Sequence, residues 1–186
     1  MLIARLQSLG LVVGPALFAL SPLFWVGGHY GMVGGMLIAV ATVPWVYGLI
    51  GEYGRLRPLL PRVAGLWLLL VLLGMFGTVA FGLQGFFEGV FGVADQTALD
   101  AFADYPPWGA AVLLLSGPVF PLAVLVLGIL HWRTRLSPRW AAGLLCAAAV
   151  LFPLARLLRL DLLAVAADLL MLAAFCVLAW RSWPRR

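Results

Sequence analysis

The sequence predicts an all-α, polytopic membrane protein with six transmembrane helices. Of its 186 residues 65% are hydrophobic and only 10% are charged, and the mean hydropathy is +1.09. An average soluble domain is about half apolar and a quarter charged, so this chain has too little charge to make a soluble surface. The apolar residues form runs of about 20, which is the length of helix that crosses a bilayer. The six expected spans, in one domain, are roughly residues 7–26, 32–51, 63–86, 108–131, 138–157 and 161–181.

The first two spans follow from the N-terminal third of the chain. Arg5 is the only charge before the first run, and no Ala-x-Ala-like cleavage site follows, so the run is interpreted as a retained helix and not as a signal peptide. Its prolines, Pro15 and Pro22, are expected to kink it. A short uncharged turn leads to the second span, with Pro44 inside it and Glu52 at its end.

The third span carries a stripe of glycines on one helical face. Small residues let another helix approach closely in a membrane, and packing is the favoured interpretation. A flat ligand sliding along the stripe is the alternative. The expected packing partner is another helix or a second copy of the chain. The stripe consists of Gly82, Gly85, Gly89 and Gly92.

An acidic segment, residues 88–105, separates the third span from the fourth. It contains Glu88, Asp95, Asp100 and Asp104. Leu99 and Phe102 between these acids suggest a short amphipathic helix on the membrane surface. The segment is interpreted as a solvated connector, with a lid over a site as the alternative. The fourth span is then expected to hold Pro118 and Pro121 near its centre.

The arginines predict the topology. With the N-terminus in the cytoplasm, all but two of the twelve Lys and Arg residues, every one of them arginine, fall in cytoplasmic segments. The exceptions are Arg156 and Arg159, which lie on the outer side together with the acidic segment. Both termini are therefore predicted to be cytoplasmic. Similar Gly and Pro spacings in the two halves suggest a weak 3+3 inverted repeat, a pattern that chance also explains.

Asp168 is the leading candidate for a functional residue. It lies seven residues beyond Asp161 and about 10 Å deeper in the last helix. Arg156 or Arg159, at the end of the fifth span, is expected to reach toward it. One interpretation is an outward-facing polar pocket, in which Asp168 carries a proton or cation and an arginine holds an anionic group. The other is an ion pair that locks the last two helices together, and the arginines could also snorkel to lipid phosphates.

Four further residues rank lower as site candidates: Glu52, Glu88, His29 and Tyr30. The two glutamates are interpreted as interfacial charges. His29 and His131 are expected on opposite sides of the membrane, which argues against a shared metal or haem, and no metal or cofactor is predicted. Cys146 and Cys176 are treated as small apolar residues, without a Cys-x-x-Cys motif.

Three motifs of the C-terminal half share a loose pattern of Pro, Trp and Arg. They are Gly117-Pro118-x-Phe120-Pro121-Leu122, Pro138-Arg139-Trp140-Ala141-Ala142 and Leu151-Phe152-Pro153-Leu154-Ala155-Arg156. Together with the single Asp of the last helix, this pattern between Trp108 and Trp180 resembles a group of small bacterial membrane proteins of unknown function. The resemblance implies about six helices and a bacterial inner membrane location, and it supplies no catalytic residues.

Three functions remain open from the sequence. The first is binding or transport of a small molecule, lipid or ion through the pocket around Asp168. The second is a membrane enzyme that uses Asp168 or Glu52 as a general acid on a lipid or isoprenoid. The third is an accessory subunit whose glycine stripe docks a partner helix. The expected partners are membrane lipids and a small hydrophobic or charged ligand, and the scattered arginines argue against nucleic acid.

Overall fold

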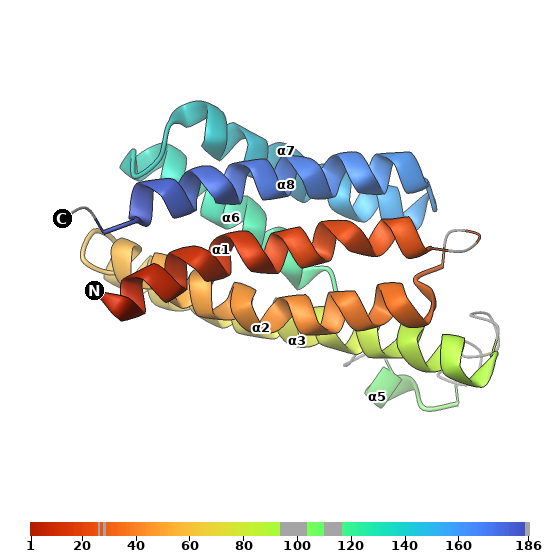
Figure 1. Ribbon diagram of the computed structural model, residues 1–186. Helices are drawn as coiled ribbons and strands as arrows, with labels where there is room; N and C mark the ends of the chain where they lie inside the picture. Colours follow the sequence, from red (N-terminus) through yellow and green to blue (C-terminus); the bar gives the residue numbers. More distant parts are fainter. Residues whose placement is uncertain (26, 28, 94–103, 110–116, 185–186) are drawn as a thin grey trace.

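The chain folds into a closed ring of six helices, each antiparallel to its neighbours. The computed structural model describes residues 1–25, 27, 29–93, 104–109 and 117–184. Around the ring, α1 packs on α2, α2 on α3, α3 on α6, α6 on α7, α7 on α8, and α8 again on α1. Both chain termini lie at the same end of the bundle (Figure 1). We call this end of the bundle the termini end and the opposite end the far end.

The first two helices of the ring cross closely because glycines remove side chains from their contact. Helix α1 spans Leu2–Leu20 and continues through Pro15, and Ser21–Phe24 forms a 3₁₀ turn that Pro22 begins. Helix α2 spans Gly31–Leu56 and also contains a proline, Pro44. At Gly14 a Cβ would clash with the Cβ of Trp45. Helix α1 begins five residues before the predicted span 7–26 and ends before it does. Helix α2 is longer than the predicted 32–51, so Glu52 lies inside it and not at its end.

The glycine stripe of the third helix packs within the chain. Helix α3 spans Pro61–Phe91, which is longer than the predicted 63–86 and includes Glu88. Gly82 faces the backbone of Gly35 and Ala39 in α2, Gly85 faces Tyr30, and Gly89 faces Met32. These three glycines therefore lie against α2 or its N-cap residue, while a Cβ at Gly92 would meet none of the described residues. Docking of a second chain on the stripe stays a prediction, and it would require α2 to move away.

The predicted fourth span is not one continuous helix. A short helix, α5, spans Pro106–Gly109, and α6 spans only Val119–Thr134. Gly117 and Pro118 form a turn before α6, so Pro118 caps the helix and Pro121 lies in its first turn. Placing these prolines near the centre of a helix was wrong, because proline fits best where the helix N–H groups have no partner anyway. The predicted surface helix at Leu99 and Phe102 lies outside the described residues.

The last two helices form an antiparallel hairpin. Helix α7 spans Arg139–Leu157 with Pro153 inside it, and α8 spans Asp161–Ser182. A tight turn joins them, in which Arg159 adopts the left-handed conformation with φ of 53°. Arg159 is not a glycine, so this conformation is uncommon. Hydroxyls of Ser8 and Ser182, 2.9 Å apart, join α8 to α1 and close the ring at the termini end.

Aromatic side chains fill the middle of the ring of helices. They come from five of its six helices. The centroids of neighbouring aromatic side chains are 5.2 to 6.3 Å apart, mostly in edge-to-face contact. Such contacts add stability beyond the area that they bury. The members of this aromatic layer are Phe18, Trp45, Phe120, Phe152 and Phe175.

The helices have the length and composition of membrane spans. Five of the described helices are long and apolar enough to cross a bilayer, counting α1 with its 3₁₀ turn, and α6 is shorter with 16 residues. Large apolar side chains are exposed around the ring, for example Val43 at 73% and Leu66 at 65%. A multi-pass membrane protein explains this exposure, since lipid would cover these side chains.

The close contact between α2 and α3 gives a stability prediction. A Cβ at Gly35 would clash with the carbonyl of Gly82 and lie 2.5 Å from the amide nitrogen of Phe86, so neither neighbour can rotate away. Gly35→Ala should lower the free energy of unfolding in detergent by about 1–3 kcal/mol. In Gly54→Ala, the matched control in the same helix, the Cβ meets nothing. Equal stability of the two variants would contradict the close contact of Gly35 with α3.

Candidate functional site

A buried ion pair joins α7 to α8 near the far end. One guanidinium nitrogen of Arg156, Nη2, lies 3.1 Å from both carboxylate oxygens of Asp168. The other, Nη1, donates to the carbonyl of Phe152 at 3.3 Å. The sequence prediction that an arginine reaches Asp168 is therefore confirmed, and Arg156 is the one that does so.

The helical hairpin places the two charges together. Arg156 is in the last turn of α7, and Asp168 is two turns into α8, which runs back antiparallel to it. Arg156 therefore extends down into the bundle, to the level of a residue that the sequence places about 10 Å deep. The apolar surroundings make pairing necessary, because an unpaired charge in hydrocarbon costs several kcal/mol.

Aromatic rings enclose the guanidinium of Arg156. Its Cζ lies 3.5 Å from the ring centroid of Phe152, 5.4 Å from that of Phe18 and 5.7 Å from that of Trp25. Phe18 and Phe152 belong to the aromatic layer, so the arginine lies against its far-end side. Cation–π contacts of this kind strengthen when the cation is removed from water.

Access to the pair differs between its two members. The side chain of Asp168 is 1% exposed, whereas that of Arg156 is 12% exposed. The Nε atom of Arg156 is buried and has no hydrogen-bond partner. A ligand arriving from the far end would therefore meet the guanidinium first and the carboxylate only after the pair opens.

The other predicted far-end residues lie around this pair without joining it. Nη1 of Arg159 is 3.3 Å from Nε2 of His29, and since a guanidinium only donates, Nε2 accepts. Asp161 is exposed in the first turn of α8, where the helix dipole favours an acid.

Two of the lower-ranked far-end candidates contact their own neighbours. Tyr30 packs edge-to-face on Trp25, with ring centroids 5.2 Å apart. Glu88 accepts a hydrogen bond from Gln84 at 2.8 Å and belongs to α3.

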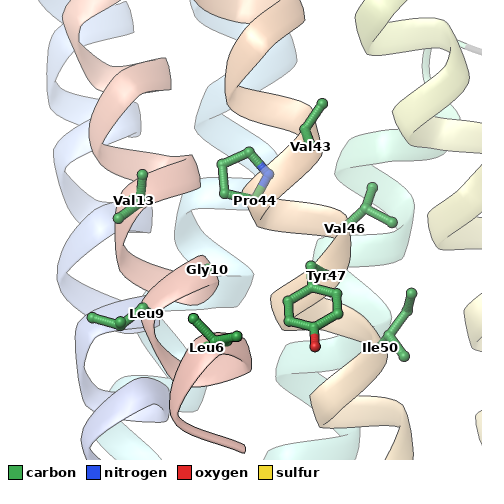
Figure 2. A pocket seen from close by; sticks show the side chains of 9 residues that line it. All are labelled: Leu6, Leu9, Gly10, Val13, Val43, Pro44, Val46, Tyr47 and Ile50. Carbon is green, nitrogen blue, oxygen red and sulfur yellow. The ribbon is translucent and has the colours of Figure 1, made fainter. Parts of the chain in front are cut away.

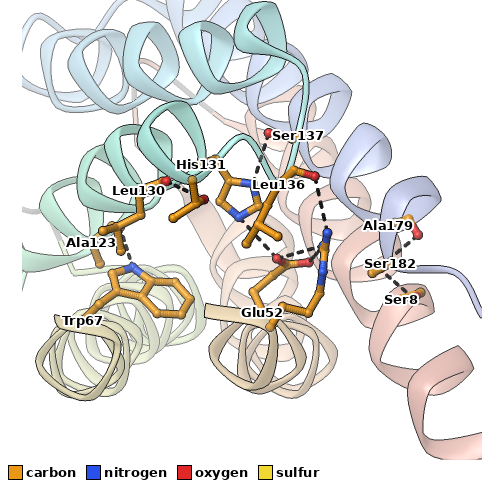
Figure 3. A network of polar contacts seen from close by, with 12 residues as sticks. Ser8, Glu52, Trp67, Ala123, Leu130, His131, Leu136, Ser137, Ala179 and Ser182 are labelled. Atoms are coloured by element: carbon orange, nitrogen blue, oxygen red, sulfur yellow. Dashed lines mark hydrogen bonds and ion pairs between the residues drawn. The ribbon is translucent and has the colours of Figure 1, made fainter. Parts of the chain in front are cut away.

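A second buried charged cluster lies at the termini end (Figure 3). Glu52 is fully buried, and Nη1 of Arg55 lies 2.8 and 3.0 Å from its two carboxylate oxygens. Nε2 of His131 approaches Oε2 of Glu52 at 3.2 Å, an electrostatic contact that is not aligned as a hydrogen bond. On the other side of the imidazole, Nδ1 of His131 lies 3.0 Å from the hydroxyl of Ser137.

This second cluster corrects the sequence interpretation of Glu52 and supplies a residue that it missed. Glu52 was expected to be interfacial, and the arginine beside it is indeed present, but the carboxylate has no exposure. His131 was considered only as a metal ligand. Its position at the same predicted membrane level as Glu52 was the available signal, because buried charges normally pair. The cluster links α2, α6 and the connection between α6 and α7.

The described residues contain no group of three or more His, Cys, Asp or Glu side chains that could hold a metal ion. Cys146 and Cys176 are free and half-buried. Cys146 lies against Gly128, where α6 and α7 approach closely. Chemistry in this part of the chain therefore rests on the two charged clusters.

Comparison of the chain with protein-family models, curated proteins and solved structures finds no match. The resemblance of the C-terminal half to small bacterial membrane proteins stays a prediction. What the arrangement can do must be judged from its chemistry. The far-end pair offers a guanidinium that can bind an anion and a carboxylate that can accept a proton, and an aromatic layer lies behind them.

The ion pair predicts strong coupling between its members. Asp168→Asn leaves the charge of Arg156 without its counter-ion and should destabilise the protein by about 3–5 kcal/mol. Asp161→Asn, on the same helix but exposed, removes only a charge favoured by the helix dipole and should cost less than about 1 kcal/mol. Replacing both members, as Arg156→Met with Asp168→Leu, should recover most of the loss, since apolar side chains of similar volume often match a buried pair. Unfolding in detergent measures all three, and additive losses in the double variant would contradict the coupling.

Proposed function

We propose that the chain is an integral membrane protein that binds a small anion at Arg156 and carries it across the membrane together with a proton. The observation that supports this proposal is the Arg156–Asp168 pair inside an apolar bundle, in which Nη2 contacts both carboxylate oxygens and only the arginine is partly exposed. Ionisable residues inside a membrane are functional candidates by default.

Exchange of counter-ions is the mechanism that this geometry suggests. An incoming carboxylate or phosphate competes with Asp168 for the guanidinium, which binds such groups in a fork-like manner. The displaced carboxylate of Asp168 then lies in apolar surroundings without a partner, where the neutral acid is far cheaper than the charged form. One anion bound at Arg156 is thus accompanied by one proton on Asp168, and their charges cancel during transfer.

The surroundings of Arg156 favour one class of anion. Phe18, Phe152 and Trp25 enclose the guanidinium, so an anion with an apolar body gains contacts that a fully hydrated ion does not. We therefore assign a small monocarboxylate as the substrate class. The aromatic layer behind the pair separates the far end from the termini end and would have to open during transfer.

The topology belongs to the same proposal. Arg156 and Arg159 lie at the far end, while the remaining described arginines belong to helix ends and connections at the termini end (Figure 1). The positive-inside rule then places both termini in the cytoplasm of a bacterial cell and the Arg156–Asp168 pair toward the outside. Six spans result if α6, with its 16 residues, also crosses the membrane.

Uptake by vesicles tests the proposal. Reconstituted protein should take up radiolabelled lactate and phenyllactate above the level of protein-free vesicles, faster when the outside is more acidic. Arg156→Met with Asp168→Leu should retain the fold but lose this uptake, and Asp161→Asn should match the wild type. Absence of uptake by the wild type, or equal uptake by the double variant, would refute transport at this pair.

One observation favours a second function, acid–base catalysis at the termini end. Ser137, His131 and Glu52 stand in series at 3.0 and 3.2 Å, the order of hydroxyl, imidazole and carboxylate that activates a nucleophile. His131 is fully buried and Ser137 is 4% exposed, so a substrate would need this end to open. This access requirement makes catalysis the weaker proposal.

Catalysis has its own test. If Ser137 attacks a lipid ester, the lipid extract of cells that express the wild type should contain a cleavage product that Ser137→Ala abolishes. Thr134→Ala is the matched control, because the Thr134 hydroxyl donates to the carbonyl of Leu130 in its own helix. Identical lipid extracts from wild type, Ser137→Ala and cells without the protein would exclude the reaction.

A further inference from the structure

The outer surface of α1 and α2 has an apolar groove with a volume of about 560 Å³. Figure 2 shows side chains of both helices along it, with the ring of Tyr47 between Leu6 and Ile50. The groove forms because α1 and α2 cross closely at Gly10, where a Cβ would clash with the carbonyl of Pro44. The helices touch through backbone there, and the larger side chains on either side form walls. The lining residues are Leu6, Leu9, Gly10, Val13, Val43, Pro44, Val46, Tyr47 and Ile50.

An unpaired cation lies in line with this groove. Arg57 follows Ile50 by seven residues, so it continues the same face of α2 toward the termini end. It is exposed, and none of the described residues forms an ion pair or hydrogen bond with its guanidinium. Gly54 lies between them, and a Cβ there would meet nothing, so the surface from Ile50 to Arg57 is open.

We propose that this groove binds one anionic phospholipid, with an acyl chain between α1 and α2 and the phosphate at Arg57. Charge complementarity identifies the occupant: the phosphate of a zwitterionic lipid is already balanced by the lipid's own cation, whereas the net negative charge of an anionic phospholipid remains to pair with Arg57. Arginine binds phosphate through a planar pair of N–H donors. The hydroxyl of Tyr47 points toward the termini end, which is the side of the headgroup (Figure 2).

The dimensions agree with a single leaflet. At 1.5 Å per residue, Ile50 lies about 10 Å and Val43 about 21 Å from Arg57 along the helix. One leaflet contributes about 15 Å of hydrocarbon and about 5–7 Å of headgroup region, or about 20–22 Å from the phosphate level to the bilayer midplane. An acyl chain whose phosphate lies beside Arg57 therefore passes Ile50 and Tyr47 and ends near Val43. The proposal is independent of transport at Arg156, which lies at the other end of the bundle.

Spin-labelled lipids test the site in vesicles of phosphatidylcholine that contain either labelled phosphatidylglycerol or labelled phosphatidylcholine. The wild type should immobilise the phosphatidylglycerol label more strongly than the phosphatidylcholine label. Arg57→Gln should lower this preference about fivefold, because the phosphate loses the charged hydrogen-bond donor that contacts it at the groove. Arg62→Gln, an exposed arginine at the start of α3, should keep it.

A second pair of variants tests the groove. Val43→Trp fills its far part and should release label of both kinds, whereas Leu66→Trp places the same ring on α3, away from the groove. Equal immobilisation of the two lipids by the wild type would overturn the proposal, as would equal effects of Arg57→Gln and Arg62→Gln. A dimer mass in mild detergent that Val43→Trp abolishes would assign the groove to a second copy of the chain instead.

Discussion

The charge of Arg156 is the constraint on which the far end of the bundle depends. A guanidinium in this position needs a counter-ion, and Asp168 supplies it with both carboxylate oxygens at 3.1 Å. Their contact fixes the register of α7 against α8, because sliding either helix by one turn would separate the charges by about 5 Å. The same guanidinium lies on the ring of Phe152, so the ion pair also determines where the aromatic layer begins.

Charge and aromatic packing divide the interior into three levels. The Arg156–Asp168 pair lies toward the far end, the aromatic layer lies behind it, and the cluster of Glu52, Arg55 and His131 lies toward the termini end. The described rings of this layer pack in contact, with neighbouring centroids 5.2 to 6.3 Å apart. The two clusters therefore lie on different sides of the aromatic layer.

The sequence predicted contacts between residues near each other in the chain and missed those made across the ring. Arg156 and Asp168 belong to one helical hairpin, so helix length and direction alone bring them together. Glu52 and His131 lie in α2 and α6, which are not neighbours around the ring, and only its closure brings them within 3.2 Å. Helix ends were also missed where proline acts as a start signal, as at Pro118. Hydropathy finds apolar runs, but caps and turns decide where each helix ends.

Stability alone gives little reason for the charged pair at Arg156 and Asp168. A buried pair roughly balances the cost of removing two ions from water, and well-packed apolar side chains of the same volume serve a bundle as well or better. The neighbouring residues Phe18 and Phe152 already provide apolar packing at this level. A lock between α7 and α8 therefore needs no charges, whereas a site that exchanges one counter-ion for another needs both. In the proposed exchange, the partial exposure of Arg156 beside a sealed Asp168 would let the anion arrive before the proton.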